Sequence, residues 1–113
     1  MVSNDTVRKL ALAFPQTDEN PHFHRKAFRV KKKIFATIDE AKRNVTLILS
    51  QVDQSVFCSY DPTVISPVPG GWGRMGATSV DLKKVKLSMF KDALTVAYCG
   101  RAPKDLAEKY NPT

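Results

Sequence analysis

The stretch from Phe23 to Ile38, FHRKAFRVKKKIFATI, decides the fold of this chain. It contains two runs rich in apolar and β-branched side chains, and a triplet of lysines, 31–33, separates them. Such runs on either side of a short polar break predict two antiparallel strands, 23–30 and 34–38, joined by a turn at the lysines. Neither Asn-Gly nor Asp-Gly marks this turn. We therefore expect a β-hairpin whose tip carries three positive charges.

Two further strands are predicted after the hairpin. Residues 45–49, VTLIL, are apolar and β-branched, and they follow a polar turn over 39–44. Residues 78–82 alternate between apolar and polar side chains, which is typical of a strand with one buried face. Residues 16–21 are polar and turn-rich, and residues 66–76 are rich in proline and glycine, so both segments are expected to be loops.

Helices are predicted around these strands from capping residues and from apolar side chains at helical spacing. The expected helices, with the residues that begin or end them, are 3–14 (Ser3, Pro15), 53–60 (Asp53, Pro62), 88–100 (Ser88, Gly100) and a short 103–110 (Pro103). Strands that follow one another through short turns form antiparallel sheets, and helices with one apolar stripe must cover them. The fold class expected is therefore α+β, a two-layer domain over residues 1–113 with an antiparallel sheet packed against helices.

Length and composition limit the classes of protein. The 113 residues suit one domain, and 42% hydrophobic residues argue against disorder. There is no apolar run of the roughly 18 residues that span a bilayer, and no signal sequence at the start, so we expect a cytoplasmic protein without a membrane partner. In that compartment Cys58 and Cys99 are expected to be free thiols.

The basic charge is concentrated in two places. The chain has 18 Lys and Arg against 11 Asp and Glu, a net charge of +7. Residues 22–33 contain six basic side chains and no acidic one, and residues 83–91 contain four and none. Residues 51–82 contain one basic and three acidic side chains. Nucleic acid, DNA or RNA, is therefore the expected partner, because lysine and arginine that neutralise phosphates release counterions.

Several local patterns follow one another in an order that resembles a known family. They are Leu12-Ala13-Phe14-Pro15; Phe28-Arg29-Val30 with Lys33-Ile34-Phe35-Ala36; Gly73-Arg74-Met75-Gly76; and Ala97-Tyr98 with Ala102-Pro103-Lys104-Asp105-Leu106. On these patterns the chain resembles the MmcQ/YjbR family of small bacterial proteins over residues 3–110. The resemblance implies a frataxin/CyaY-like double-wing fold and the family's label of predicted DNA-binding protein.

Two features set this chain apart from what the resemblance implies. Family members often carry a tryptophan at the position of Ala77, whereas the tryptophan here is Trp72. The fold's namesake is linked to iron through a strongly acidic helical surface. The first expected helix here has Asp5 against Arg8 and Lys9, so iron binding is not carried over.

The leading hypothesis is a nucleic-acid binding module that acts through the basic hairpin and the glycine-rich loop, with weak sequence specificity. The residues expected to make contact are Arg25, Lys26, Arg29, Lys31, Lys32, Lys33, Trp72, Arg74, Lys83 and Lys84. In the loop, Trp72 stacks on a base beside a phosphate-binding Arg74, or Trp72 folds back as a lid on the core. The lysines likewise have an ordinary alternative as solvated charges that keep strand edges soluble.

Other functions have less support in the sequence. The alternative to nucleic-acid binding is an adaptor that binds a protein or small ligand through the loop 67–76. His22 and His24 are expected on the same side of a strand, but no spacing supplies the four ligands of a structural zinc site. No nucleophile-and-base signature is present, so we expect neither catalysis nor a cofactor.

Overall fold

The computed structural model describes residues 1–110. The chain forms six strands and five helices in this part. Their bounds are α1 (Asn4–Ala13), β1 (Thr17–His22), β2 (Arg25–Val30), β3 (Lys33–Asp39), β4 (Asn44–Ile48), α2 (Gln51–Tyr60), β5 (Ile65–Pro67), α3 (Gly71–Arg74), β6 (Ala77–Asp81), α4 (Leu87–Arg101) and α5 (Lys104–Ala107). Within residues 1–110, no helix is both long and apolar enough to cross a bilayer.

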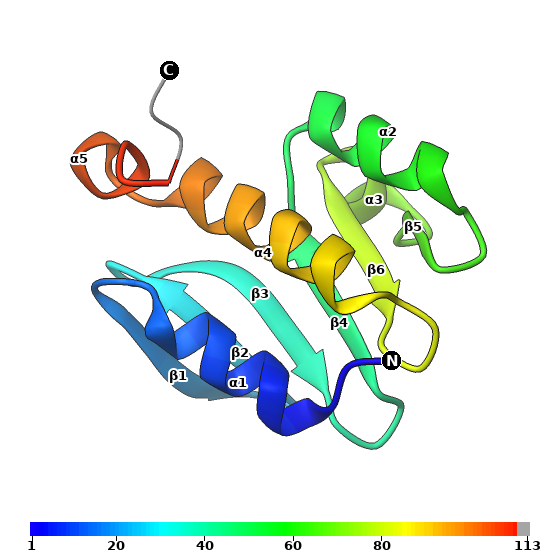
Figure 1. Ribbon diagram of the computed structural model, residues 1–113, viewed down its shortest axis with the longest axis horizontal. Helices are drawn as coiled ribbons and strands as arrows, with labels where there is room; N and C mark the ends of the chain where they lie inside the picture. Colours follow the sequence, from blue (N-terminus) through cyan, green and yellow to red (C-terminus); the bar gives the residue numbers. More distant parts are fainter. Residues whose placement is uncertain (111–113) are drawn as a thin grey trace.

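The strands form one antiparallel sheet in the order β1-β2-β3-β4-β6-β5. Helices α1 and α4 lie across one face of this sheet, and α2 lies near the end that carries β5 (Figure 1). The expected two-layer α+β architecture with an antiparallel sheet is confirmed. The core lies between the helices and the sheet, and its largest buried side chains include Tyr98, Phe28, Phe35 and Phe90.

An aromatic cluster joins the helices to the hairpin. Tyr98 of α4 stacks on Phe14 with ring centroids 4.4 Å apart and meets Phe35 edge-on at 5.6 Å. The Tyr98 hydroxyl donates to the carbonyl of Pro15 at 2.8 Å, and burial raises the pKa of this phenol. The register between β2 and β3 shifts between Phe28 and Arg29, so Phe35 is an extra residue on β3 and is buried beside Ala36.

The largest difference from the expected fold is β1. Residues 16–21 were expected to be a loop, but Thr17–His22 pair along their whole length with β2. This strand contains no buried residue, and it includes Pro21, which is tolerated because the strand lies at the edge of the sheet. This strand is stabilised by backbone pairing and by polar contacts, so its sequence has no apolar pattern from which a strand could be predicted.

The loop expected over 66–76 contains a short strand and a helical turn, β5 and α3. Two glycines of this segment allow its backbone to lie close to the carbonyl groups of neighbouring segments. A Cβ on Gly73 would lie 1.8 Å from the carbonyl oxygen of Val68, and one on Gly76 would lie 1.8 Å from that of Leu49. Gly76 also has φ of 107°, which L side chains rarely adopt.

Several expected caps are wrong. Helix α2 is capped by Ser50, whose hydroxyl accepts the N–H of Asp53, so Asp53 lies in the first turn. Helix α4 begins one residue before Ser88, after Lys86 in the capping position, because Leu87 already has helical geometry. Gly100 lies inside α4, which ends at Arg101 ahead of Pro103. The Ser3 cap of α1 is confirmed, since its hydroxyl accepts the N–H of Thr6 at 3.1 Å.

Candidate nucleic-acid interface

The turn between β2 and β3 consists of two lysines in an unusual backbone conformation. Val30 pairs with Lys33, which leaves Lys31 and Lys32 as the central residues of a two-residue hairpin loop. Their φ angles are 50° and 68°. Positive φ at both positions is the feature of a type I′ turn, where Asn-Gly is preferred because side chains such as lysine are strained there. We call Lys31, Lys32 and Lys33 the lysine turn.

The side chains of the lysine turn are open to solvent. All three residues are exposed, and within residues 1–110 none has a carboxylate within 4.0 Å of its amino group. Arg101, at the end of α4, donates from Nε to the carbonyl of Ile34 at 3.1 Å. A fourth cation is therefore placed beside the start of β3. Sequence reasoning missed Arg101, because nothing in the sequence brings the end of a helix to a turn 67 positions away.

Arg25, by contrast, is held by the sheet. Its guanidinium donates to both Thr37 oxygens, at 2.9 and 3.3 Å, and to the Thr46 hydroxyl at 3.3 Å. It also lies 3.9 Å from the buried carboxylate of Asp39. Burial lowers the pKa of Arg25, while Asp39 acts in the opposite direction. Arg25 therefore joins β2, β3 and β4, and it is not free for a phosphate.

Two more cations of β2 are paired with acidic side chains. Lys26 Nζ lies 2.7 Å from Glu40, which raises the pKa of this lysine. Arg29 donates two hydrogen bonds to Asp18 of β1, at 2.8 and 3.1 Å, and these bonds lower the pKa of that carboxyl group. Of the six basic residues expected to bind on the hairpin, the structure leaves the three of the lysine turn unpaired.

The second basic stretch lies at the other end of the sheet. Lys83 and Lys84 are exposed just after β6 ends at Asp81. Asp39, at the far end of β3, pairs with Asn44, which pairs with Asp81. Lys33 and Asp39 are six residues apart on one strand, which corresponds to about 20 Å. The two acid-free stretches of the sequence therefore do not form a single patch.

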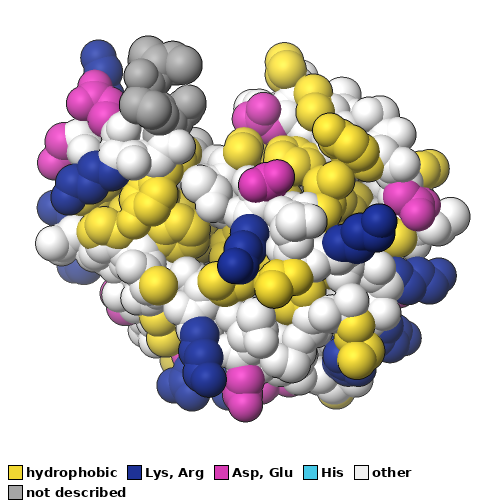
Figure 2. Space-filling model, viewed as in Figure 1, with side chains coloured by type: hydrophobic (Ala, Val, Ile, Leu, Met, Phe, Trp, Pro, Cys, Tyr) yellow, Lys and Arg dark blue, Asp and Glu magenta, His cyan; other side chains and the backbone are white. Residues whose placement is uncertain are grey.

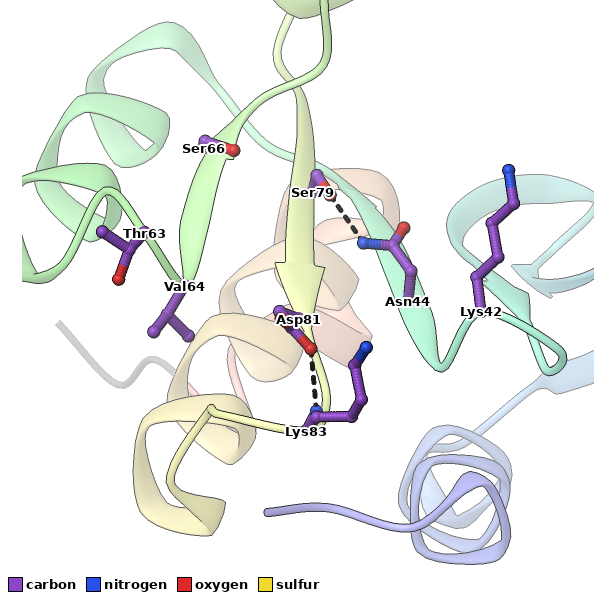
Figure 3. A pocket seen from close by; sticks show the side chains of 8 residues that line it. All are labelled: Lys42, Asn44, Thr63, Val64, Ser66, Ser79, Asp81 and Lys83. Carbon is purple, nitrogen blue, oxygen red and sulfur yellow. Dashed lines mark hydrogen bonds between the residues drawn. The ribbon is translucent and has the colours of Figure 1, made fainter.

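A shallow hollow of about 320 Å³ lies beside Lys83 over β4, β6 and β5 (Figure 3). Hydroxyl and amide groups line it, and Lys42 and Lys83 stand at its edge. In register across the strands, Thr46 faces Ser79, which faces Ser66. Asn44 donates to the Ser79 hydroxyl at 2.7 Å, and Asp81 accepts the backbone N–H of Lys83 at 2.9 Å. The surface of the hollow is mainly polar. Lys42 was not among the contact residues predicted from the sequence.

Trp72 and Arg74 lie on α3. The Trp72 side chain is 69% exposed, so the interpretation of this residue as a lid on the core is wrong. Gln51 and Gln54 of α2 hold the helical turn by donating to the carbonyls of Arg74 and Gly73, each at 2.8 Å. Trp72 and Arg74 are thus presented to solvent next to α2, away from the lysine turn in sequence and in the sheet.

The two histidines do not share one side of a strand. His22 ends β1, and Phe23 follows with φ of 58°, so His24 lies in the turn before β2. The expectation of a same-side pair is wrong for this reason. His24 Nε2 lies 3.9 Å from Asp39. Among residues 1–110, no group of three His, Cys, Asp or Glu side chains is close enough to hold a metal ion.

The sequence of residues 12–99 matches the YjbR family model. The chain belongs to the YjbR family. The resemblance inferred from the sequence motifs is thereby confirmed. The fold is also similar to the crystal structure of Deinococcus radiodurans protein DR2400, which has a DUF419 domain: the TM-score is 0.75 at 18% identity, over 88% of this chain and 78% of that one. No match was found among curated proteins.

Proposed function

We propose that this YjbR-family protein binds nucleic acid, DNA or RNA, through its phosphate backbone, with the lysine turn as the main contact. One observation carries the proposal: Lys31 and Lys32 both occupy left-handed positions, and within residues 1–110 neither has a carboxylate oxygen within 4.0 Å of its amino group. Left-handed geometry costs a side-chain-bearing residue about 1–2 kcal/mol. Solubility alone does not need lysine at these two positions, because charge at neighbouring exposed sites serves equally well.

The shape and charge of this end of the sheet support phosphate contact. A projecting hairpin tip reaches a phosphate backbone, and Arg101 lies beside it. The three to four phosphate contacts of the lysine turn and Arg101 predict that affinity for duplex DNA falls with salt at a log–log slope of about −3 to −4, and any further contact makes the slope steeper. Lys83 and Lys84 form a second contact in the proposal. They lie about 20 Å from the lysine turn, and this distance corresponds to roughly six base pairs along a duplex, so one duplex can reach both sites. Binding of this kind carries little sequence information.

The proposal assigns a binding role without a catalytic step, in the cytoplasm. Arg25, Lys26 and Arg29 contribute to it indirectly, by holding the strands that present the turn. Trp72 and Arg74 of α3 are not required for the backbone contact.

The test is fluorescence anisotropy of labelled duplex DNA at several salt concentrations. The variant Lys31→Asn/Lys32→Gly replaces the two lysines with the pair that the turn geometry prefers, so the hairpin is kept while two charges are lost. We expect its affinity to fall at least about tenfold at low salt, and its salt slope to become shallower by about 2.

The matched control is Lys9→Gln/Lys91→Gln. Both lysines are exposed, on α1 and α4, and the net charge falls by the same two units. We expect less than about a threefold loss of affinity for this variant. Equal losses for the two variants, or no binding by the unchanged protein at low salt, would overturn the proposal.

A further inference from the structure

The exposed residues of α2 carry no charge, and its one charged residue, Asp53, is half-buried. The exposed residues of this helix are Gln51, Val52, Ser55, Val56, Ser59 and Tyr60. Val52, Val56 and Tyr60 are spaced four residues apart and are 73%, 50% and 67% exposed, so they form one apolar stripe towards solvent. Solvent-facing helix surfaces are normally polar or charged. In a protein with 26% charged residues, this face therefore needs another explanation.

Two further exposed apolar side chains lie at α3, on the flank of α2 that carries Gln51 and Gln54. Trp72 and Met75 are 69% and 81% exposed. The bonds from Gln51 and Gln54 to α3 hold this segment against the first turn of α2. We call Val52, Val56, Tyr60, Trp72 and Met75, with Ser55 and Ser59 between them, the α2–α3 face. In Figure 2, hydrophobic side chains run along the surface at the upper right, where Figure 1 places α2.

The charges around the α2–α3 face indicate what covers it. The protein carries a net charge of +7, so two copies repel each other unless they meet away from the basic groups. Residues 51–82, which include this face, have one basic and three acidic side chains, and Lys84 and Lys86 lie beside Tyr60 and Asp61 at one end of it. Arg74 lies at the N-terminal end of α2, beside Gln51, and Asp61 caps the C-terminal end. Hydrogen bonds from Thr63 lower the pKa of Asp61, which keeps its carboxylate charged.

We propose that the α2–α3 face binds a second copy of this chain, with the two α2 helices packed antiparallel about a two-fold axis. An axis through the middle of Gln51–Tyr60 places Val56 against Ser55 of the partner copy. It also places Val52 against Ser59, so bulky side chains meet small ones. The same axis brings Arg74 of each copy near the charged Asp61 of the other, because α2 spans about 15 Å from end to end.

One polar group on this face is already paired within its own chain. The Ser59 hydroxyl already donates to the carbonyl of Val56 at 2.7 Å, so covering it leaves no unpaired donor. The five large side chains supply on the order of 600 Å² of exposed surface per copy, against about 800 Å² per partner in a standard interface. The dimer is therefore reversible, and dissociates on dilution.

The test is sedimentation equilibrium without DNA, on the unchanged chain and on two variants of one exposed residue. The unchanged chain should approach twice the monomer mass as its concentration rises. Val56→Glu and Val56→Lys each place like charges around the axis, and each should weaken dimerisation at least about tenfold. Mixed in equal amounts, the two variants should form the heterodimer, because the charges at the axis are then opposite.

Leu12→Glu and Leu12→Lys are the matched controls, since Leu12 is exposed on α1 at 37% and lies outside the α2–α3 face. They should dimerise like the unchanged chain. Arg74→Glu is an independent variant and should also weaken the dimer. An unchanged chain that stays monomeric at all concentrations would overturn the proposal, and would leave the face to a different partner. Failure of the Val56 mixture to dimerise would exclude the two-fold arrangement.

Discussion

Strand β2 and the turn that follows it each carry three basic side chains, and the two sets differ in whether they contact acidic side chains. Arg25, Lys26 and Arg29 of the strand all contact acidic side chains. The three lysines of the turn contact none within residues 1–110. A charge count along the sequence gives the two sets equal weight. The difference shows that strand register, rather than local composition, decides which charges are available to a ligand.

The register explains each pairing on the strand. Asp18 lies directly opposite Arg29 on β1, within reach of a two-bond contact. Lys26 is opposite Ile38, so its side chain reaches Glu40, two positions further along the chain. Lys31 and Lys32 lie at the end of the hairpin, outside the paired residues of β2 and β3, and no acidic side chain lies opposite them in the sheet register. Cations on the strand therefore stabilise the sheet, and cations on the turn have no ion-pair partner among residues 1–110.

The largest effect expected from this comparison is at Arg25. Arg25→Gln removes the bonds to Thr37 and Thr46 and leaves Asp39, only 5% exposed, without its guanidinium neighbour. We expect a loss of about 2–3 kcal/mol in the free energy of unfolding, measured with urea. Lys33→Gln is the control, and should leave the midpoint unchanged. Equal midpoints for Arg25→Gln and the unchanged chain would show that Arg25 is not structural.

The turn should respond in the opposite direction. In Lys31→Asn/Lys32→Gly, residues suited to positive φ replace two strained lysines. We expect the free energy of unfolding to rise by about 1–2 kcal/mol. The urea midpoint checks this, with Lys9→Gln/Lys91→Gln as the variant of equal charge. A gain in stability with a loss of DNA affinity separates the two roles of these positions, whereas a loss of stability would contradict the strained-turn interpretation.

The smallest effect concerns the exposed pair of Asp18 and Arg29, and it depends on pH. The fold lowers the pKa of Asp18 below its ordinary 3.8, so the pair stabilises the protein above that value. This contribution disappears as the pH falls through the lowered pKa. Asp18→Asn should therefore be slightly less stable than the unchanged chain at neutral pH, and the difference should vanish in strong acid. Asp92→Asn, at an exposed site outside the ion pairs of residues 1–110, should show no such pattern.

Sequence patterns could predict the parts of the fold that bury apolar side chains. Strands β2, β3, β4 and β6 and helices α1, α2 and α4 all place a hydrophobic pattern against the core. Strand β1, TDENPH, has no such pattern, because it pairs only through its backbone and polar contacts at the edge. The short β5 and α3 were missed for a related reason: backbone hydrogen bonds and the close approach of Gly73 hold this segment.

The basic residues of the candidate site could be predicted from the sequence, but which of them lack an acidic partner could not. The lysine turn was expected at the correct place, because two apolar runs flank it. The pairing of Lys26 and Arg29 depends on which residues the neighbouring strands bring close to them. Strand β1 was not predicted, so the pairing of Arg29 with Asp18 could not be predicted either. Arg101 and Lys42 were missed because their neighbours in space are far away in the sequence. Exposure of Trp72 follows from how Gln51 and Gln54 hold α3, which no local motif reveals.

Both outer strands of the sheet contain a proline, Pro21 in β1 and Pro67 in β5. Proline has no backbone N–H, so each border of the sheet has a gap in its row of hydrogen-bond donors. A row with gaps is a poor template for a strand from another molecule. An open sheet is otherwise prone to grow by edge-to-edge pairing into insoluble aggregates. These two residues therefore help to keep the concentrated protein from aggregating through its sheet, independently of any ligand.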